Sequence, residues 1–161
     1  TIRFGTGEWP NISSKKLCDI DIAPVCSPEY LASNPIAQIT DLKSHRIIVT
    51  SSMFEDWGQW GLGEDLSNQD TMVCDSYMSA IKAASAGLGV AMGIFPITNA
   101  WVNKGLLALP LTQRFTVPYA YWVCAPGHHP HPATDAFFRW SKALFEQIPD
   151  LENSETGGQF T

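Results

Sequence analysis

The sequence has no long apolar run and little charge. None of its apolar stretches approaches the roughly 20 residues that a helix needs to cross a bilayer, and its start does not resemble a secretion signal. We therefore expect no membrane association and a cytoplasmic location. Charged residues make up 16% of the 161-residue chain and hydrophobic residues 45%, which suits one sizeable core or two small lobes.

Positive charge is especially scarce. The 10 Lys and Arg residues are outnumbered by 16 Asp and Glu residues, and the formal net charge is −6. Only Lys15 and Lys16 are adjacent, so the sequence has no basic stripe. Proteins bind duplex DNA by neutralising phosphates with Lys and Arg. We therefore do not expect these residues to bind nucleic acid.

Cysteine is sparse and widely spaced. The four residues, Cys18, Cys26, Cys74 and Cys124, form no C-x-x-C motif, which argues against a redox pair or a zinc site. We expect reduced thiols that pack as small apolar residues in a cytosolic protein. Cys26 and Cys124 both fall in predicted strands, so the sequence leaves open that these two thiols lie close together.

Catalytic motifs are also missing. The sequence contains no G-x-S-x-G elbow, no P-loop and no G-x-G-x-x-G fingerprint after a strand. His128, His129 and His131 lie in a proline-rich turn without a cysteine or carboxylate at ligand spacing, which favours a solvated turn over a metal site. We predict no enzyme activity, no metal and no cofactor.

The most informative stretch is residues 73–93. Val73 and Cys74 resemble the end of a strand, and Asp75 and Ser76 are residue types that cap a helix. Apolar residues then recur at helical spacing until Gly87, where a left-handed residue would end the helix. The free N–H groups of the first turn are suited to an anionic or polar ligand atom. A well-capped α/β unit without a ligand is the plainer alternative.

Strands and helices alternate along the rest of the chain. Strands are predicted at residues 2–4, 17–26, 46–50, 88–94, 106–109 and 119–125. The clearest amphipathic helix is predicted at 133–148, with Phe137, Trp140, Ala143 or Leu144, and Ile148 on its apolar face. Trp57 and Trp60 are predicted to be core residues because large aromatic side chains mostly supply buried area. This alternation predicts an α/β fold with a mainly parallel sheet.

Several motifs occur in a specific order. They are T-I-R-F-G-T-G-E-W-P at the start, D-I-A-P-V-C-S-P-E-Y-L-A, D-L-K-S-H-R-I-I-V, a W-x-x-W loop, D-S-Y-M-S-A-I-K-A-A-S-A-G-L-G-V-A-M-G, Y-A-Y-W-V and A-F-F-R-W. The series resembles the effector-binding domain of LysR-type transcriptional regulators. It is most similar to the subgroup that holds the glycine-cleavage activator and the β-lactamase-gene regulator, and it covers residues 1–148.

The resemblance implies a fold like that of type II periplasmic binding proteins, with two lobes joined by crossover strands. The expected division is the end of the first lobe at 1–19, crossover strands at 20–26 and 119–125, the second lobe at 27–118, the return to the first lobe at 126–148 and a disordered tail at 149–161. The opening of the first lobe and a helix-turn-helix would precede Thr1. The last helix would then lack the surface on which it packs, so an isolated fragment should be unstable or pair with another chain.

The same resemblance implies effector-binding residues. Ser76 matches the helix-cap position facing the cleft, and Tyr121 matches the cleft tyrosine, although a core tyrosine is the alternative for Tyr121. The full predicted set is Ser76, Tyr121, Arg3, Gly5, Trp9, Thr50, Ser51, Asp75 and Tyr77. An amino acid, an aromatic acid and a cell-wall peptide all fit as effectors, and the subgroup slightly favours the peptide.

The sequence therefore predicts a ligand-sensing domain whose effector changes the angle between two lobes. We expect a homo-oligomer, a dimer or a tetramer, that contacts DNA only through a domain outside this chain. A solute-binding protein of a transporter is the alternative with the same fold, and an unrecognised small-molecule enzyme is a third possibility.

Overall fold

The computed structural model describes residues 1–50, 55–62, 66, 68–127 and 132–151. Along these residues the elements are β1 (Ile2–Gly5), β2 (Ile12–Val25), α1 (Pro28–Ser33), η1 (Ile39–Ser44), β3 (Ile47–Thr50), η2 (Glu55–Trp60), β4 (Thr71–Cys74), α2 (Tyr77–Ser85), β5 (Val90–Phe95), α3 (Asn99–Asn103), β6 (Phe115–Pro126) and α4 (Pro132–Glu146). No helix in the described residues is long and apolar enough to span a membrane.

The strands form one mixed sheet in the order β1-β6-β2-β5-β3-β4. Only β3 pairs in parallel, with β4 and β5, whereas β1 with β6, β6 with β2 and β2 with β5 are antiparallel. The prediction of a mainly parallel sheet is therefore wrong. Alternating strands and helices indicated parallel crossovers, but β2 and β6 pair along their length across a large separation in sequence.

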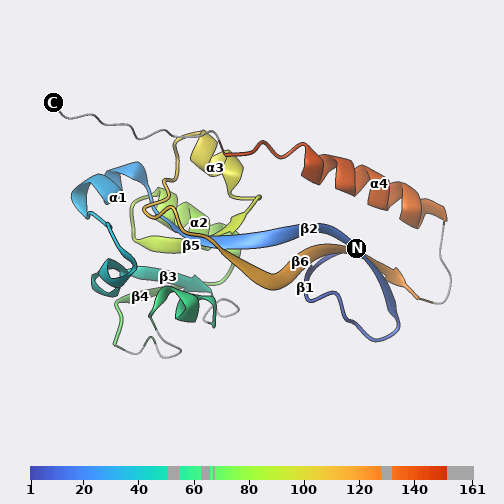
Figure 1. Cartoon of the computed structure of the whole chain (residues 1–161), viewed down its shortest axis with the longest axis horizontal. Coiled ribbons are helices and arrows are strands. Elements are labelled where there is room, and N and C mark those ends of the chain that lie inside the picture. The colour runs from blue at the N-terminus through green and yellow to red at the C-terminus, as the bar shows by residue number, and fades with distance from the viewer. Residues whose placement is uncertain (51–54, 63–65, 67, 128–131, 152–161) are drawn as a thin grey trace.

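Two long strands connect the two ends of the molecule (Figure 1). One half of β2 lies beside β5 and the helices α1, α2 and α3, and its other half pairs with β6 near β1 and α4. β2 begins five residues earlier than predicted, because the polar stretch Ser13–Lys16 pairs with β6 on an exposed part of the sheet. The division of the chain into lobes remains a prediction.

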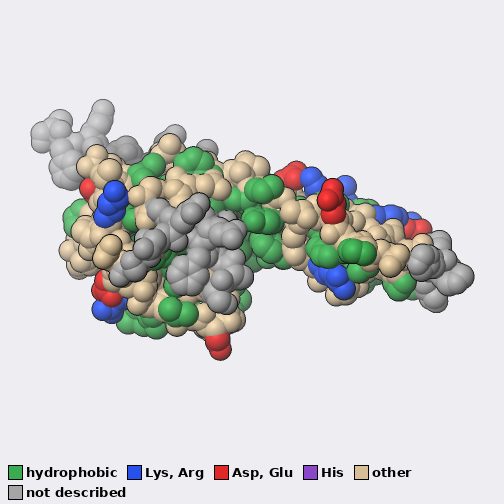
Figure 2. Space-filling model, turned by 90° about the horizontal axis from the view of Figure 1, so that it is seen from below, with side chains coloured by type: hydrophobic (Ala, Val, Ile, Leu, Met, Phe, Trp, Pro, Cys, Tyr) green, Lys and Arg blue, Asp and Glu red, His purple; other side chains and the backbone are tan. Residues whose placement is uncertain are grey.

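The main hydrophobic core lies at the β3–β5 end. All of β3 and β5 is buried, and α2 covers these strands with Ala80, Ile81 and Ala84. Trp57 and Trp60 have no exposed surface and belong to the same cluster, which confirms their predicted role as core residues. On the face shown in Figure 2, positive and negative side chains are interspersed rather than gathered into a basic stripe.

The residues predicted to begin and end helices α1 and α2 do so in the structure. Ser27 caps α1 by accepting a hydrogen bond from the N–H of Tyr30, and Pro28 occupies the first turn. Ser76 caps α2 in the same way. After α2, Gly87 has a φ of 76°, the left-handed conformation that glycine adopts without a steric penalty. In contrast, the predicted strand at 106–109 contributes only an isolated bridge between Ala108 and Cys26.

Helix α4 packs on the sheet through a face adjacent to the predicted one. Ser141 is buried, with an exposed fraction of 1%, and the partly buried Phe138 and Phe145 flank it one helical turn away on either side. The predicted apolar residues Phe137, Trp140 and Leu144 are instead exposed in this chain. Helix α4 therefore has a broad apolar surface, of which the sheet covers only one side.

The four cysteines form no disulfide. Cys26 and Cys124 are buried, while Cys18 and Cys74 are half-buried. Cys124 pairs with Ser14 on β2, and Cys26 follows Val25 at the other end of that strand. At about 3.3 Å per residue, these thiols are on the order of 40 Å apart, so the possibility of a close pair is excluded. Among the described residues, no group of three or more possible metal ligands is brought together.

We expect Gly89→Ala to lower the free energy of unfolding by roughly 1–3 kcal/mol, the cost of a residue held in an unfavourable backbone conformation. Gly89 has a φ of +155°, and an added Cβ would lie 2.6 Å from the carbonyl oxygen of Arg46. That oxygen accepts the N–H of Val90, so it is fixed. Gly58 has no atom within 4 Å of an added Cβ, and Gly58→Ala is the control in urea denaturation. An equal response of the two variants would contradict the steric argument.

Candidate functional site

The candidate site lies where parallel strands end. Thr50 at the end of β3 is in register with Cys74 at the end of β4, and Asp75 and Ser76 follow Cys74 directly. The carboxyl edge of parallel strands, next to a helix N-terminus, is a frequent location of ligand sites in α/β proteins. Thr50 is buried, whereas Asp75 and Ser76 are exposed. Ser51 lies outside the described residues.

Ser76 organises the start of α2 through short polar contacts. Its Oγ accepts the N–H of Ser79 at 3.3 Å and lies 2.8 Å from the Ser79 hydroxyl, which in turn donates to Oδ1 of Asp75 at 2.8 Å. Hydrogen bonds from the side chains of Ser79 and Ser76 lower the pKa of Asp75. Asp75 therefore stays charged beside the helix N-terminus. This carboxylate would repel a second one, an effect that solvent weakens because Asp75 is exposed.

Tyr121 lies on β6 among aromatic rings. Its ring centroid is 5.5 Å from that of Phe4 on β1 and 5.6 Å from that of Phe145 on α4. Burial, with smaller contributions from Tyr77 and Cys18, raises the pKa of Tyr121 to about 12, so the phenol is neutral at physiological pH. No described residue is hydrogen-bonded to its hydroxyl. The ring is packed as a core tyrosine would be, and the hydroxyl stays available to a ligand.

Tyr77 connects the start of α2 to the core. Its hydroxyl lies 2.7 Å from Oγ1 of Thr98 and accepts the N–H of Ile94 at 2.9 Å. Burial raises the pKa of Tyr77. The polar atom of Tyr77 is thus engaged in the fold, and Tyr77 makes a small contribution to the raised pKa of Tyr121.

The predicted residues near the N-terminus lie on the other face of the sheet. Arg3 pairs with Trp122, and Phe4 with Tyr121; because neighbouring strand residues point to opposite faces, Arg3 and Tyr121 are not brought together. The Arg3 guanidinium stacks 5.6 Å over the Trp9 ring, and the Trp122 indole donates to the Gly5 carbonyl at 2.9 Å. The structure therefore groups Arg3, Gly5 and Trp9 around Trp122, away from Tyr121.

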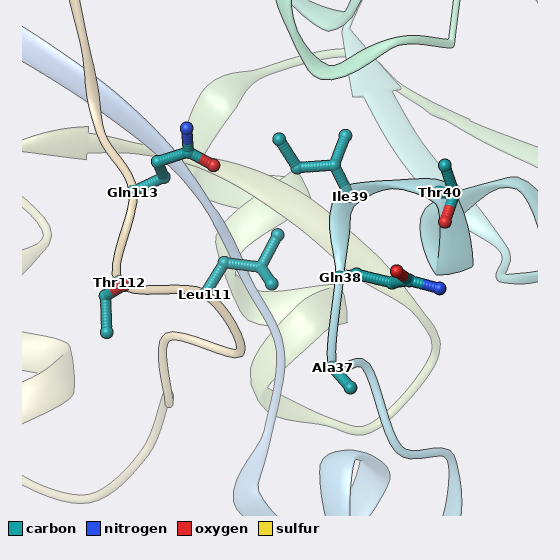
Figure 3. Close-up of a pocket in the computed structure, with 7 residues that line it drawn as sticks. All are labelled: Ala37, Gln38, Ile39, Thr40, Leu111, Thr112 and Gln113. Carbon is teal, nitrogen blue, oxygen red and sulfur yellow. The ribbon is translucent and has the colours of Figure 1, made fainter.

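Of three cavities in the described residues, one has a residue of the predicted set, Arg3, in its lining. A cavity of about 440 Å³ separates residues 37–40 from residues 111–113, and the side chains of Ile39, Leu111 and Gln113 point toward this space (Figure 3). It has no charged lining residue. Arg3 lines a second cavity, of about 480 Å³, beside the start of β1. A smaller third cavity, of about 240 Å³, is lined by Asp21, Asn99 and Arg114, which the sequence did not single out.

Comparison with known proteins identifies the family. The family model described as the LysR substrate binding domain matches residues 1–146. The glycine cleavage system transcriptional activator homolog of Haemophilus influenzae is 28% identical over 125 residues, covering 76% of this chain and 41% of that protein. The transcriptional activator AmpR of Citrobacter freundii is 28% identical over 145 residues, covering 87% of this chain and 48% of AmpR. The chain thus spans about half the length of the curated relatives it matches.

Solved structures agree with this assignment. The AmpR effector binding domain from Citrobacter freundii has a TM-score of 0.74 at 26% identity, and the match covers 90% of this chain and 73% of that one. That domain has also been solved with a threonine, a serine and a tyrosine replaced by valine, alanine and phenylalanine. The fold is accordingly the type II periplasmic-binding-protein-like fold predicted from the sequence, and the relatives named are regulators rather than enzymes. The chain belongs to the family of LysR substrate binding domains.

Proposed function

We propose that this chain is the effector-sensing part of a LysR-type transcriptional regulator, with the effector bound between the start of α2 and Tyr121. The observation that carries the proposal is the position of Ser76, which caps α2 at the carboxyl edge of β3 and β4. Tyr121, on β6, supplies a neutral hydroxyl. The regulators among its relatives support this function over that of a transporter's solute-binding protein.

The proposed effector connects the two ends of the molecule. Ser76 belongs to the end built on β3, β4 and β5, whereas Tyr121 contacts β1 and α4 at the other end. An effector that contacts both residues favours one angle between these ends. It shifts the equilibrium only by the difference between its affinities for the two arrangements.

The proposal for the complete regulator draws on the length of its relatives. The chain is about half as long as they are, so the proposal places DNA binding in a helix-turn-helix outside this chain and the complete protein in the cytoplasm as a homo-oligomer. The change in angle would then alter the spacing of the DNA-binding domains within the oligomer.

The chemistry of the site narrows the effector class. The charge of Asp75 opposes a second carboxylate, while the hydroxyls of Ser76 and Tyr121 both donate and accept hydrogen bonds. This arrangement suits a ligand rich in amides, such as a peptide.

The experiment uses the complete regulator and a reporter gene under its control. Ser76→Gly removes the hydroxyl and, because glycine is an acceptable cap, costs only a few tenths of a kcal/mol in stability. Tyr121→Phe removes the second hydroxyl. We expect each change to raise the effector concentration for half-maximal response about tenfold, which corresponds to about 1.4 kcal/mol of binding.

Two matched variants serve as controls. Ser85→Ala removes a hydroxyl that donates to the Lys82 carbonyl at the far end of α2. Tyr30→Phe removes a phenol that contacts Nδ1 of His45, away from β6. Both should respond like the parent protein. If all four variants show the parent response, Ser76 and Tyr121 do not bind the effector.

A further inference from the structure

A small cavity of about 240 Å³ has no lining residue in common with the predicted effector site. Its lining comes from β2, the end of β5, the start of α3, the residue before β6 and the segment that follows α4. Figure 1 shows this last segment returning from α4 to α3. There Asn99 and Asn103 donate to the carbonyls of Pro149 and Asp150, each at 2.9 Å. The cavity therefore lies where both long strands, α3 and the C-terminal segment meet.

Asn99 leaves an unused acceptor at this cavity. The residue has an exposed fraction of only 4%, and its Nδ2 is engaged with Pro149. Its Oδ1 is buried and has no hydrogen-bond partner among the described residues. A buried acceptor without a donor loses the hydrogen bonds that it would make with water. Asn99 lines the cavity, so an oxygen that lacks a donor lies within the residue that forms part of its wall.

Opposite charges line the same cavity without pairing. The Arg114 guanidinium is held 4.3 Å over the Phe95 ring, and no described carboxylate forms an ion pair with it. Asp150 likewise has no ion-pair partner among the described residues. Asp21 accepts a hydrogen bond from the Thr116 hydroxyl at 2.6 Å.

One neighbouring carboxylate in the lining is already neutralised. Asp19 pairs with Lys16 at 2.8 Å. The groups that remain for a ligand are therefore one guanidinium and the carboxylates of Asp21 and Asp150.

We propose that this cavity is a second ligand site, for a small zwitterion of the free amino acid class. The ammonium group would face the carboxylates of Asp21 and Asp150, beside Asn99. The carboxylate would pair with Arg114, whose planar guanidinium binds carboxylates through two hydrogen bonds. The volume admits only a small side chain. Because a ligand here contacts both long strands and the C-terminal segment, its binding stabilises one arrangement of the two ends.

The test is isothermal titration calorimetry on the complete protein with L-alanine as the probe. Ethylamine and propionate serve as controls of similar size that carry only one of the two charges. We expect L-alanine to bind and both controls to bind at least tenfold more weakly. Heat from none of the three would mean that water alone fills the cavity and would overturn the proposal. Equal binding of ethylamine and L-alanine would overturn the assigned role of Arg114.

Variants then locate the bound amino acid. Arg114→Gln and Asp150→Asn alter side chains outside the hydrophobic core, and each should weaken L-alanine binding at least tenfold. Ser76→Gly should leave that binding unchanged. Loss of binding in Ser76→Gly but not in Arg114→Gln would place L-alanine in the effector site and overturn this proposal, while the reporter experiment on Ser76 and Tyr121 tests the effector site separately.

Discussion

Replacing Trp60 with alanine should lower the free energy of unfolding by about 3–5 kcal/mol, the range for large aromatic deletions in protein cores. Trp60 has no exposed surface, and its ring meets that of Phe115 edge-on with centroids 4.8 Å apart. The alanine variant loses this aromatic contact and leaves a cavity that the surrounding side chains fill only in part. Urea denaturation followed by circular dichroism measures the change.

Trp60→Phe is the matched control, because it keeps an aromatic ring. It also removes the indole N–H of Trp60, which is buried and has no hydrogen-bond partner among the described residues. Removing an unsatisfied donor offsets part of the lost packing. We therefore expect Trp60→Phe to cost less than half as much as Trp60→Ala. Losses below about 1 kcal/mol for both variants, the range of ordinary substitutions, would contradict the assignment of Trp60 to the core.

Local chemistry could be predicted from the sequence. The serine that caps α2 and the glycine that ends it act within a few residues along the chain, and the structure confirms Ser76 and Gly87 in these roles. The order of motifs added the family and the fold, both of which the comparisons confirm. The cap and the terminal glycine could be predicted because their contacts are local, and the family because several short motifs follow one another in order over residues 1–148.

Pairing between distant segments could not be predicted in the same way. Whether the strands of the sheet are mainly parallel or antiparallel depends on the pairing of β2 with β6. In this pairing Ile12 lies opposite Pro126, which is more than a hundred residues away along the chain. The alternating pattern of elements contains no information on that pairing. Similarly, the apolar stripes of α4 that contain Phe138 and Trp140 are neighbours on the helix, and only the position of the sheet decides which one is buried.

In the candidate site, too, local features could be predicted from the sequence, whereas contacts between distant segments could not. Ser76 was found because the cap is a local signal, and its place in the effector site remains a prediction. The cavity beside Asn99 was missed because its lining residues come from five separate segments, and Asp21, Asn99 and Arg114 match no motif. Asn99 at the start of a helix resembles an ordinary capping residue in sequence. Only the structure shows that its Oδ1 is buried without a partner.

The apolar surface of α4 should make the isolated chain self-associate. Phe137, Trp140 and Leu144 are exposed on α4, Trp140 with an exposed fraction of 58%, and the rings of Phe137 and Trp140 lie 5.7 Å apart. Contiguous exposed apolar side chains of this kind usually mark a contact surface. We expect residues 1–151 to sediment as a concentration-dependent oligomer, and the double variant Trp140→Lys and Leu144→Lys to sediment as a monomer.

The same double variant should have a different effect in the complete regulator. There we expect a preceding segment to cover this surface, as the sequence predicts for the last helix. Replacing two buried apolar side chains would then remove the free energy of their burial. This loss is roughly 3–6 kcal/mol of stability, at about 1.5–3 kcal/mol for each buried side chain. In the isolated chain both side chains are already largely exposed, so the cost should be small.

Glu146→Lys, on the opposite side of α4, is the control because it changes the charge by the same two units. It should affect neither the sedimentation of the isolated chain nor the unfolding of the complete protein. If the lysine pair at 140 and 144 leaves the complete protein as stable as the parent, no segment covers α4 there. The surface would then have to be a contact between two copies of the chain, and the double variant would still convert the oligomer to a monomer.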